Sequence, residues 1–143
     1  NLTSLSSLYL HENNLFGSIP EEIGYLRSLT TLDLSINSLN GSIPPSLGNL
    51  TNLSFLGLFG NNISGSIPEE IGCLRSLTKL ILGENSLNGS IPASLGNLTS
   101  LSSLYLYENN LFGSIPEEIG YLRSLTMLDL SINSLNGSIP PSL

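Results

Sequence analysis

Residues 26–50 read LRSLTTLDLSINSLNGSIPPSLGNL, and this pattern of aliphatic, Asn, Gly and Pro positions returns every 24 residues along the chain. With Asn1 as place 1, Leu or Ile occupies places 2, 5, 8, 10, 15, 19 and 23 of each 24-residue coil. These places hold 42 of the 45 Leu and Ile residues, so one packing arrangement is used six times. The spacing predicts a single array of stacked coils at residues 1–24, 25–48, 49–72, 73–96, 97–120 and 121–143.

Each coil carries the signals of a short strand and a short helical turn. Leu8 and Leu10 alternate with the residues at places 7, 9 and 11, which is typical of a strand with one buried face. The segment 19–24 predicts a helical turn that begins near Pro20 and is stopped by Gly24. One coil cannot bury seven aliphatic side chains alone, so stacking must provide the core, between a parallel sheet and a row of turns.

A second column lies at place 13, which is asparagine in every coil. A side-chain amide beside the core can donate to and accept from the backbone of adjacent coils. We therefore interpret the column as a structural, hydrogen-bonded ladder rather than as a ligand site. Its members are Asn13, Asn37, Asn61, Asn85, Asn109 and Asn133.

Each coil resembles the plant-specific leucine-rich-repeat pattern LxxLxxLxLxxNxLxGxIPxxLGxL. The segments GSIPEEIGYLRSLT and GSIPPSLGNLT are similar to those in ectodomains of plant receptor-like kinases and receptor-like proteins. The resemblance implies an α/β solenoid: a right-handed superhelix with a concave parallel sheet, convex 3₁₀ turns and a second short sheet near the GSIP segment. It also implies an extracellular or cell-surface setting.

The family usually adds cysteine-paired caps and, in receptors, a transmembrane helix and a kinase, none of which this sequence contains. We therefore expect internal repeats of a longer array, without capping domains. The terminal coils should expose leucines, since stacked repeats need caps to cover their ends. End-to-end self-association through the uncapped coils is a further expectation.

Composition excludes several classes of function. Four Lys and Arg residues against eleven Asp and Glu residues give a net charge of −7, which argues against binding nucleic acid or anionic membranes. The sequence contains no apolar run long enough for membrane insertion. Cys73 is the single cysteine, so an internal disulfide framework and a multi-cysteine metal site are excluded. We expect no metal or cofactor, and a semi-buried free thiol at Cys73.

Since the aliphatic places are fixed, recognition must depend on the variable places 6, 7, 9, 11 and 12, which we expect on the concave face. Aromatic side chains gather there in coils 3 to 5 and predict an apolar patch with a charged rim, typical of a binding surface. The candidate ligand-binding residues are Tyr9, His11, Phe55, Phe59, Lys79, Ile81, Tyr105 and Tyr107.

The expected partner of this face is a peptide or protein ligand, and a co-receptor ectodomain is a second candidate. The acidic residues of the same face, Asp33 and Asp129 among them, favour a basic or hydroxyl-rich partner. Family peptide receptors often capture a terminal carboxylate with paired basic side chains. Lys79 is the only basic residue at the concave places, which argues against that mode here.

Catalysis is not expected. Glu pairs at residues 21–22, 69–70 and 117–118 lie on the convex turns, where adjacent carboxylates do not face one cleft. We expect a solvated face with weak ion pairs to Arg27, Arg75 and Arg123. His11 has no nucleophile in a recognisable context. The sequence therefore predicts a non-enzymatic binding module.

Sequons for N-glycosylation support a secretory route, because no asparagine of the place-13 column begins one although its neighbours do. The candidate acceptors are Asn1, Asn40, Asn49, Asn52, Asn62, Asn88, Asn97 and Asn136.

Two other functions fit parts of the pattern. A secreted protein similar to polygalacturonase inhibitors would also use acidic and aromatic concave residues. An ice-binding or structural array would use the regular hydroxyl row at place 6, although bulky neighbours such as Tyr9 and Phe55 argue against a flat ice face. Residues 1–47 and 97–143 differ only at His11 against Tyr107 and Thr31 against Met127, which indicates a recent duplication or a sequence designed from a template.

Overall fold

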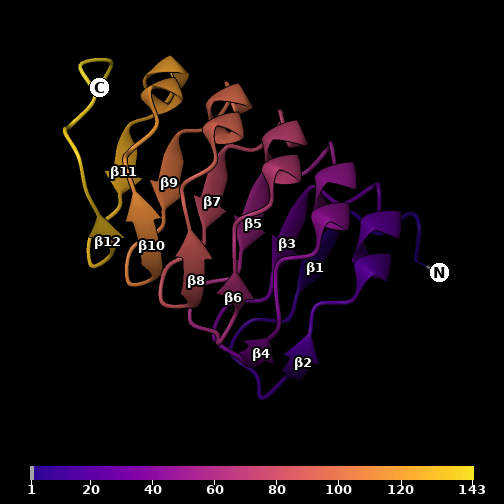
Figure 1. The fold of residues 1–143 in the computed structure, drawn as a ribbon. Coiled ribbons are helices and arrows are strands. Elements are labelled where there is room, and N and C mark those ends of the chain that lie inside the picture. The colour runs from indigo at the N-terminus through magenta and orange to yellow at the C-terminus, as the bar shows by residue number, and fades with distance from the viewer. Residues whose placement is uncertain (1) are drawn as a thin grey trace.

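The computed structural model describes residues 2–143 as a stack of parallel-stranded coils (Figure 1). A six-stranded parallel sheet has the order β1-β3-β5-β7-β9-β11. Its strands are β1 (Ser7–Tyr9), β3 (Thr31–Asp33), β5 (Phe55–Gly57), β7 (Lys79–Ile81), β9 (Ser103–Tyr105) and β11 (Met127–Asp129). Each residue of these strands pairs with the residue 24 positions further along the chain, for example Leu8 with Leu32 and Leu32 with Leu56. The predicted strand with one buried face is therefore confirmed, and it covers places 7 to 9 of the alternating segment at places 7 to 11.

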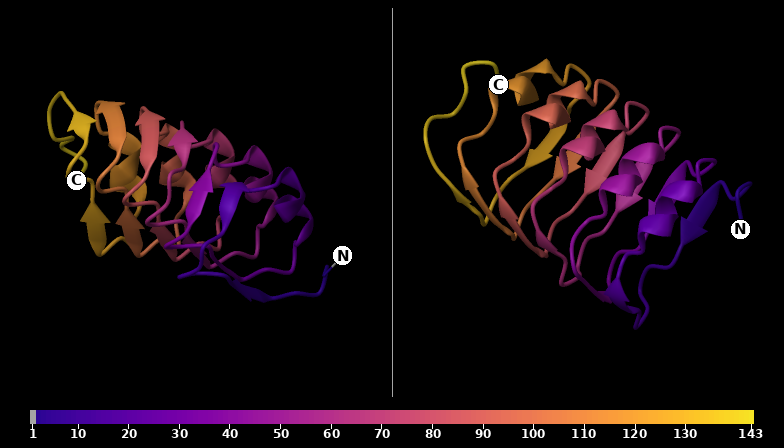
Figure 2. Two further views of the ribbon diagram at one scale, coloured as in Figure 1. Left: turned by 90° about the horizontal axis from the view of Figure 1, so that it is seen from below. Right: turned by 45° about the vertical axis from the view of Figure 1, so that its right-hand side comes forward.

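A row of 3₁₀ turns forms the opposite side of the stack. The turns are η1 (Glu21–Tyr25), η2 (Pro45–Asn49), η3 (Glu69–Cys73), η4 (Ala93–Asn97) and η5 (Glu117–Tyr121). They fan apart more widely than the strands of the six-stranded sheet, which therefore lies on the inner, concave side (Figures 1 and 2). In the described residues no helix is long and apolar enough to cross a membrane.

The second short sheet follows the ladder asparagines, beside the GSIP segment, and is divided in two. Its strands are β2 (Phe16–Ser18), β4 (Ser38–Asn40), β6 (Ser64–Gly65), β8 (Ser86–Gly89), β10 (Asn110–Gly113) and β12 (Ser134–Leu135). Strands β2 and β4 pair with each other, and β6 to β12 form a four-stranded sheet. A single bridge between Ser42 and Ser64 joins the two parts.

The repeated aliphatic places fill the space between the sheets and the turns. In the inner coils these side chains are fully buried, as at Leu32, Leu56 and Leu80, which stack on one another across strands β3, β5 and β7. The terminal coils expose the same places: Leu2 is 68% and Ile139 is 78% accessible. Most aliphatic places of the terminal coils are less buried than their equivalents in the inner coils, as the sequence predicts, although Ile19 and Leu122 are buried against a single neighbouring coil.

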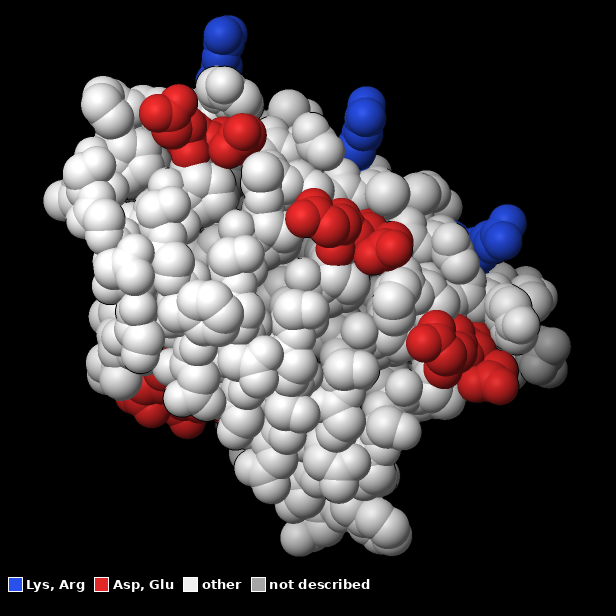
Figure 3. Space-filling model, viewed as in Figure 1, with Lys and Arg blue, Asp and Glu red and all other residues white. Residues whose placement is uncertain are grey.

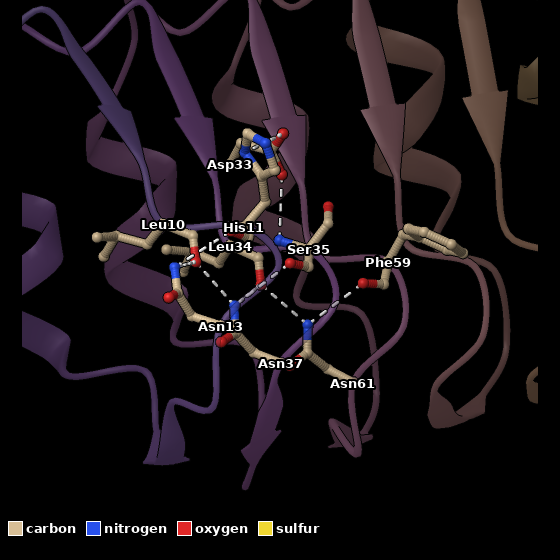
Figure 4. A network of polar contacts seen from close by, with 9 residues as sticks. All are labelled: Leu10, His11, Asn13, Asp33, Leu34, Ser35, Asn37, Phe59 and Asn61. Atoms are coloured by element: carbon tan, nitrogen blue, oxygen red, sulfur yellow. Dashed lines mark hydrogen bonds and ion pairs between the residues drawn. The ribbon is translucent and has the colours of Figure 1, made fainter.

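Each inner asparagine at place 13 joins two coils (Figure 4). The Asn61 Nδ2 group donates to the carbonyl oxygens of Leu58 in its own coil and Leu34 in the preceding coil, both at 3.1 Å. Its Oδ1 atom accepts the N–H of Leu39 at 3.0 Å. The same bonds recur at Asn37, Asn85, Asn109 and Asn133. Asn13, in the first coil, donates only to carbonyls of its own coil.

The role predicted for Gly24 is wrong. Turn η1 continues through Gly24 to Tyr25, and Gly24 is buried inside it. A Cβ atom on this residue would lie 2.6 Å from the backbone oxygen of Ser46 in the next coil. Glycine is therefore required here by the close approach of successive turns, and it does not end the helix.

Two other expectations for the convex side are also wrong. The thiol of Cys73 is exposed, because this residue ends η3 on the outer surface. The acidic pairs and the arginines stand apart on the convex side (Figure 3). Among the described residues, the single acid–base contact within 4.0 Å is His11 to Asp33, so the weak Glu–Arg ion pairs are not formed.

Place 12 adopts the left-handed backbone conformation in every coil. The φ angle is 54° at Ile36 and 53° at Ile132, although β-branched residues disfavour this region. The N–H of Ile36 donates to the carbonyl of Phe59 in the following coil at 2.7 Å. The bend thus directs the chain out of the concave strand toward the ladder asparagine.

The ladder predicts a position-dependent loss of stability. We expect Asn61→Ala to lower the free energy of unfolding by about 2–3 kcal/mol, because it leaves buried backbone donors and acceptors unpaired. Asn13→Ala, at the exposed first coil, is the matched control and should cost less than about 1 kcal/mol. Urea unfolding followed by circular dichroism measures both; equal losses would contradict a ladder that joins coils.

Candidate ligand-binding site

Two rows of side chains cross the concave sheet at right angles to its strands. The place-9 row consists of Tyr9, Asp33, Gly57, Ile81, Tyr105 and Asp129, which are paired in register from strand to strand. The place-11 row consists of His11, Ser35, Phe59, Gly83, Tyr107 and Ser131. Both rows follow directly from the 24-residue register, since side chains at alternate places of a strand share a face.

Three aromatic rings form a cluster at the C-terminal half of these rows. The ring of Tyr107 lies 6.4 Å from that of Phe59 and 6.4 Å from that of Tyr105, centroid to centroid. Phe59 and Tyr107 belong to coils 3 and 5, so the residue between them in the row is Gly83. A Cβ atom on Gly83 would lie 2.6 Å from the Tyr107 ring, so this glycine allows the two rings to meet.

A shallow depression of about 370 Å³ adjoins the cluster. It is lined by Lys79, Ile81, Tyr105, Tyr107 and Asp129. The Lys79 ammonium group lies 5.8 Å from the centroid of the Tyr105 ring, within the range of a cation–π interaction. Apolar rings, one cation and one carboxylate therefore converge on one surface.

The electrostatic environment of this depression is acidic. Burial raises the pKa of the Tyr107 phenol, and the negative charges of Glu84, Glu108 and Asp129 raise it further. The Ser131 hydroxyl donates to Asp129 Oδ1 at 2.6 Å and lowers the pKa of that carboxyl, as does the Ser131 N–H at 3.0 Å. Asp129 is thus held ionised, and the surroundings favour a cationic group of a ligand.

The N-terminal half of the rows forms a second depression. Tyr9, Thr31, Asp33 and Phe55 line it. The His11 ring makes an edge-on contact with Tyr9 at 6.2 Å, and its Nδ1 atom lies 3.5 Å from Asp33 Oδ2.

The eight residues singled out from the sequence therefore divide between two places. The depression of the N-terminal half holds Tyr9, His11 and Phe55. The aromatic cluster and the depression beside it hold Phe59, Lys79, Ile81, Tyr105 and Tyr107.

Sequence reasoning named Asp129 as an acidic concave residue but did not place it beside Tyr105. The 24-residue register could have placed it there, because the residues at place 9 of neighbouring coils are partners in adjacent strands. It also missed Gly83, whose signal is a glycine between two aromatic residues in one row. No group of three metal-ligating side chains occurs among residues 2–143.

An uninterrupted stack of short parallel strands and 3₁₀ turns defines a solenoid repeat protein. The family model described as a leucine-rich repeat region matches residues 1–111 and 45–141. The chain belongs to the leucine-rich-repeat family. No curated protein sequence matches it significantly.

Solved structures of plant receptor ectodomains superpose closely on the chain. The ectodomain of the Arabidopsis thaliana receptor kinase GASSHO1/SCHENGEN3, in complex with CASPARIAN STRIP INTEGRITY FACTOR 2, has a TM-score of 0.95 at 44% identity. That match covers 96% of this chain and 17% of the receptor chain. The plant peptide hormone receptor RGFR1, in complex with RGF2, has a TM-score of 0.97 at 45% identity, covering 99% of this chain and 23% of that one.

A third structure contains a co-receptor. The Arabidopsis receptor kinase HAESA, in complex with the peptide hormone IDA and the co-receptor SERK1, has a TM-score of 0.94 at 40% identity, covering 96% of this chain and 23% of that one. The chain thus spans roughly a fifth of the length of these receptors' resolved chains. The resemblance to plant receptor ectodomains is confirmed over the array itself.

Because a Cβ atom at position 83 would collide with the Tyr107 ring, adding one methyl group there should change the aromatic cluster. Gly83→Ala should displace the Tyr107 ring and remove its contact with Phe59, while costing less than about 1 kcal/mol of stability because the ring is partly exposed. Ring-to-ring nuclear Overhauser effects measure the contact. Ser35→Ala, at the same place of coil 2, is the control. Persistence of the Phe59–Tyr107 contact in Gly83→Ala would contradict the role given to this glycine.

The raised pKa of Tyr107 predicts a pH dependence at the alkaline end. Well below pH 10, the Tyr107 phenol is protonated in both the folded and the unfolded chain, so its contribution to stability is fully present. As the pH rises through the raised pKa, the unfolded phenol ionises first and the wild type loses stability relative to Tyr107→Phe. A titration followed by phenolate absorbance should show Tyr107 ionising at this raised pH. Glu84→Gln removes one of the negative charges that raise the pKa and should move this ionisation to lower pH. An unshifted ionisation would contradict the acidic environment.

Proposed function

We propose that the chain is a non-enzymatic recognition module of a plant extracellular ectodomain, and that it binds an extended peptide across the concave sheet. The observation that carries the proposal is the meeting of Phe59 and Tyr107 across Gly83. Rings from different coils form one apolar surface flanked by Lys79 and Asp129. Aromatic anchors with a polar rim are the usual composition of a protein-binding surface.

The shape of the surface supports an extended ligand. The backbone of the sheet is fully paired between strands β3 and β9, so a ligand can engage only the side chains that stand on it. The depressions are shallow and follow one another along the rows, which suits a peptide better than a compact small molecule. RGFR1 is a peptide hormone receptor solved with RGF2, and HAESA was solved with the peptide hormone IDA and a co-receptor, which is the second partner class we propose.

Glycan acceptors are compatible with this surface. Every sequon asparagine in the described part of the chain is exposed: Asn40, Asn49, Asn52, Asn62, Asn88, Asn97 and Asn136. Asn1 lies outside the described residues. None of them is at place 9 or 11, so glycans at these positions would leave the concave rows open. We propose that they are glycosylated in a secretory, cell-surface setting.

The hydroxyl row at place 6 gives little support to ice binding. Thr30 Oγ1 donates to the carbonyl oxygen of Ser6 at 3.0 Å, and Ser54 Oγ donates to that of Thr30 at 2.9 Å. The same bond recurs at Thr78, Ser102 and Thr126. These hydroxyl groups therefore donate their protons to the preceding coil and stabilise the stacking of coils.

A peptide-display selection tests the proposed function. We expect a random dodecapeptide library to yield binders whose affinity falls at least about a hundredfold in the double variant Phe59→Asp, Tyr107→Asp, because charge is placed inside the apolar cluster. The circular dichroism spectrum should be unchanged.

Phe16→Asp and Phe112→Asp provide the matched control. Both phenylalanines are exposed, at 86% and 54%, and both lie in the second sheet, away from the concave rows. An equal loss of binding in this control, or none in the concave variant, would move the site to another face.

A further inference from the structure

Three charged residues of the concave sheet stand on strands at regular intervals. Asp33 on β3 and Asp129 on β11 occupy the same place-9 row and are separated by four strand steps. Lys79 lies on β7, two steps from each aspartate. Its ammonium group leans over the Tyr105 ring, and Tyr105 is a member of the place-9 row. Across the sheet, the charges therefore alternate from negative on β3 to positive on β7 and negative on β11, with Lys79 at place 7 beside the place-9 row.

The two aspartates occupy matching environments, because the chain contains the same segment twice. The N–H of Ser35 donates to Asp33 Oδ1 at 3.1 Å, and the N–H of Ser131 donates to Asp129 Oδ1 at 3.0 Å. Each aspartate is also the strand partner of a tyrosine, Tyr9 or Tyr105. The two carboxylates are thus oriented alike at both ends of the face.

Two differences separate these environments. The Ser131 hydroxyl donates to Asp129 Oδ1 at 2.6 Å, whereas Asp33 accepts only the N–H of Ser35 among the described residues. His11 Nδ1 lies 3.5 Å from Asp33, whereas the equivalent residue beside Asp129 is Tyr107. Asp33 therefore has an imidazole ring beside its carboxylate, and Asp129 does not. The other charged groups of this face are Glu12, Glu84 and Glu108 at place 12, which add to its negative potential.

The separation of the charges defines a ligand length. Strands in a sheet are about 4.8 Å apart, so four steps place the aspartates roughly 19 Å from each other. An extended peptide advances about 3.3 Å per residue, so about six residues span that distance and about three reach from either aspartate to Lys79.

We propose that the concave face selects an extended peptide with cationic side chains at positions i and i+6 and a carboxylate at i+3. The cations pair with Asp33 and Asp129, and the carboxylate pairs with Lys79. Apolar residues between i+3 and i+6 lie against Phe59, Tyr105 and Tyr107. This inference rests on the proposed peptide-binding function and adds the charge pattern of the ligand.

The test uses two blocked decapeptides of identical composition in a glycine–serine background, each with leucine at its sixth position. The first has arginine at its second and eighth positions and glutamate at its fifth. The second has arginine at its second and fifth positions and glutamate at its eighth. We expect the first peptide to bind about tenfold more tightly by calorimetry, and its advantage to shrink at high salt.

Substitutions then assign the contacts. Asp129→Asn should weaken the first peptide about fivefold, and Asp33→Asn somewhat less because His11 already faces that carboxylate. Glu21→Gln and Glu117→Gln, which remove exposed convex carboxylates from equivalent coils, are matched controls and should leave its affinity unchanged. Lys79→Glu should prefer a version of the first peptide with lysine at its fifth position.

Equal affinity of the two peptides, absence of binding by both, or equal effects of the concave and convex substitutions would overturn the charge pattern. The proposed function is judged separately. If both peptides bind equally and Phe59→Asp, Tyr107→Asp abolishes both, peptide recognition stands and the spacing rule falls. If neither decapeptide binds, the library selection still decides whether the concave face recognises peptides.

Discussion

The hydrogen bonds of the place-13 asparagines are the interaction on which the rest of the structure depends. At Asn61 and Asn109, a buried side chain satisfies backbone groups of two coils at once. Because a slip of one coil against the next would break these bonds, the ladder fixes the 24-residue register. The aliphatic core alone would be less selective, since leucines tolerate small shifts better than directional hydrogen bonds do.

The proposed recognition surface is a consequence of that register. With each strand aligned to the next, a residue type chosen at place 9 or 11 of one coil has a known neighbour in the following coil. Glycine at position 83 then brings Phe59 and Tyr107 together across an intervening strand. The same alignment sets Asp33, Lys79 and Asp129 at equal intervals. The proposed function thus depends on the variable places of a scaffold that is otherwise constant.

The repeat made most of the fold predictable. The strand positions, the turns near Pro20 and its equivalents, and the exposed terminal leucines all follow from spacing and from the need to bury seven aliphatic side chains per coil. The role of Gly24 did not follow, because the reason for a glycine there is contact with the next coil. The left-handed conformation of Ile36 was equally hidden, since nothing in a β-branched residue indicates it.

The candidate site was less predictable than the fold. Sequence position assigns Phe55 and Phe59 to the concave side, yet the direction in which each ring leans depends on its neighbours. Phe55 lines the depression with Tyr9 and Asp33, whereas Phe59 reaches toward Tyr107. The absent Glu–Arg ion pairs have a similar cause, because the distance between convex charges depends on how widely the turns fan apart.

Amide hydrogen exchange tests the central claim most directly. The N–H groups of Leu39, Ile63, Leu87 and Leu111 donate to the side-chain oxygen of the asparagine in the next coil. If the ladder holds the coils in register, these amides should exchange only through global unfolding, as slowly as the amides at the centre of the concave sheet. Exchange at the rate of exposed loop amides would contradict this account. It would show that the aliphatic core holds the stack together and that the asparagine hydrogen bonds do not fix the register.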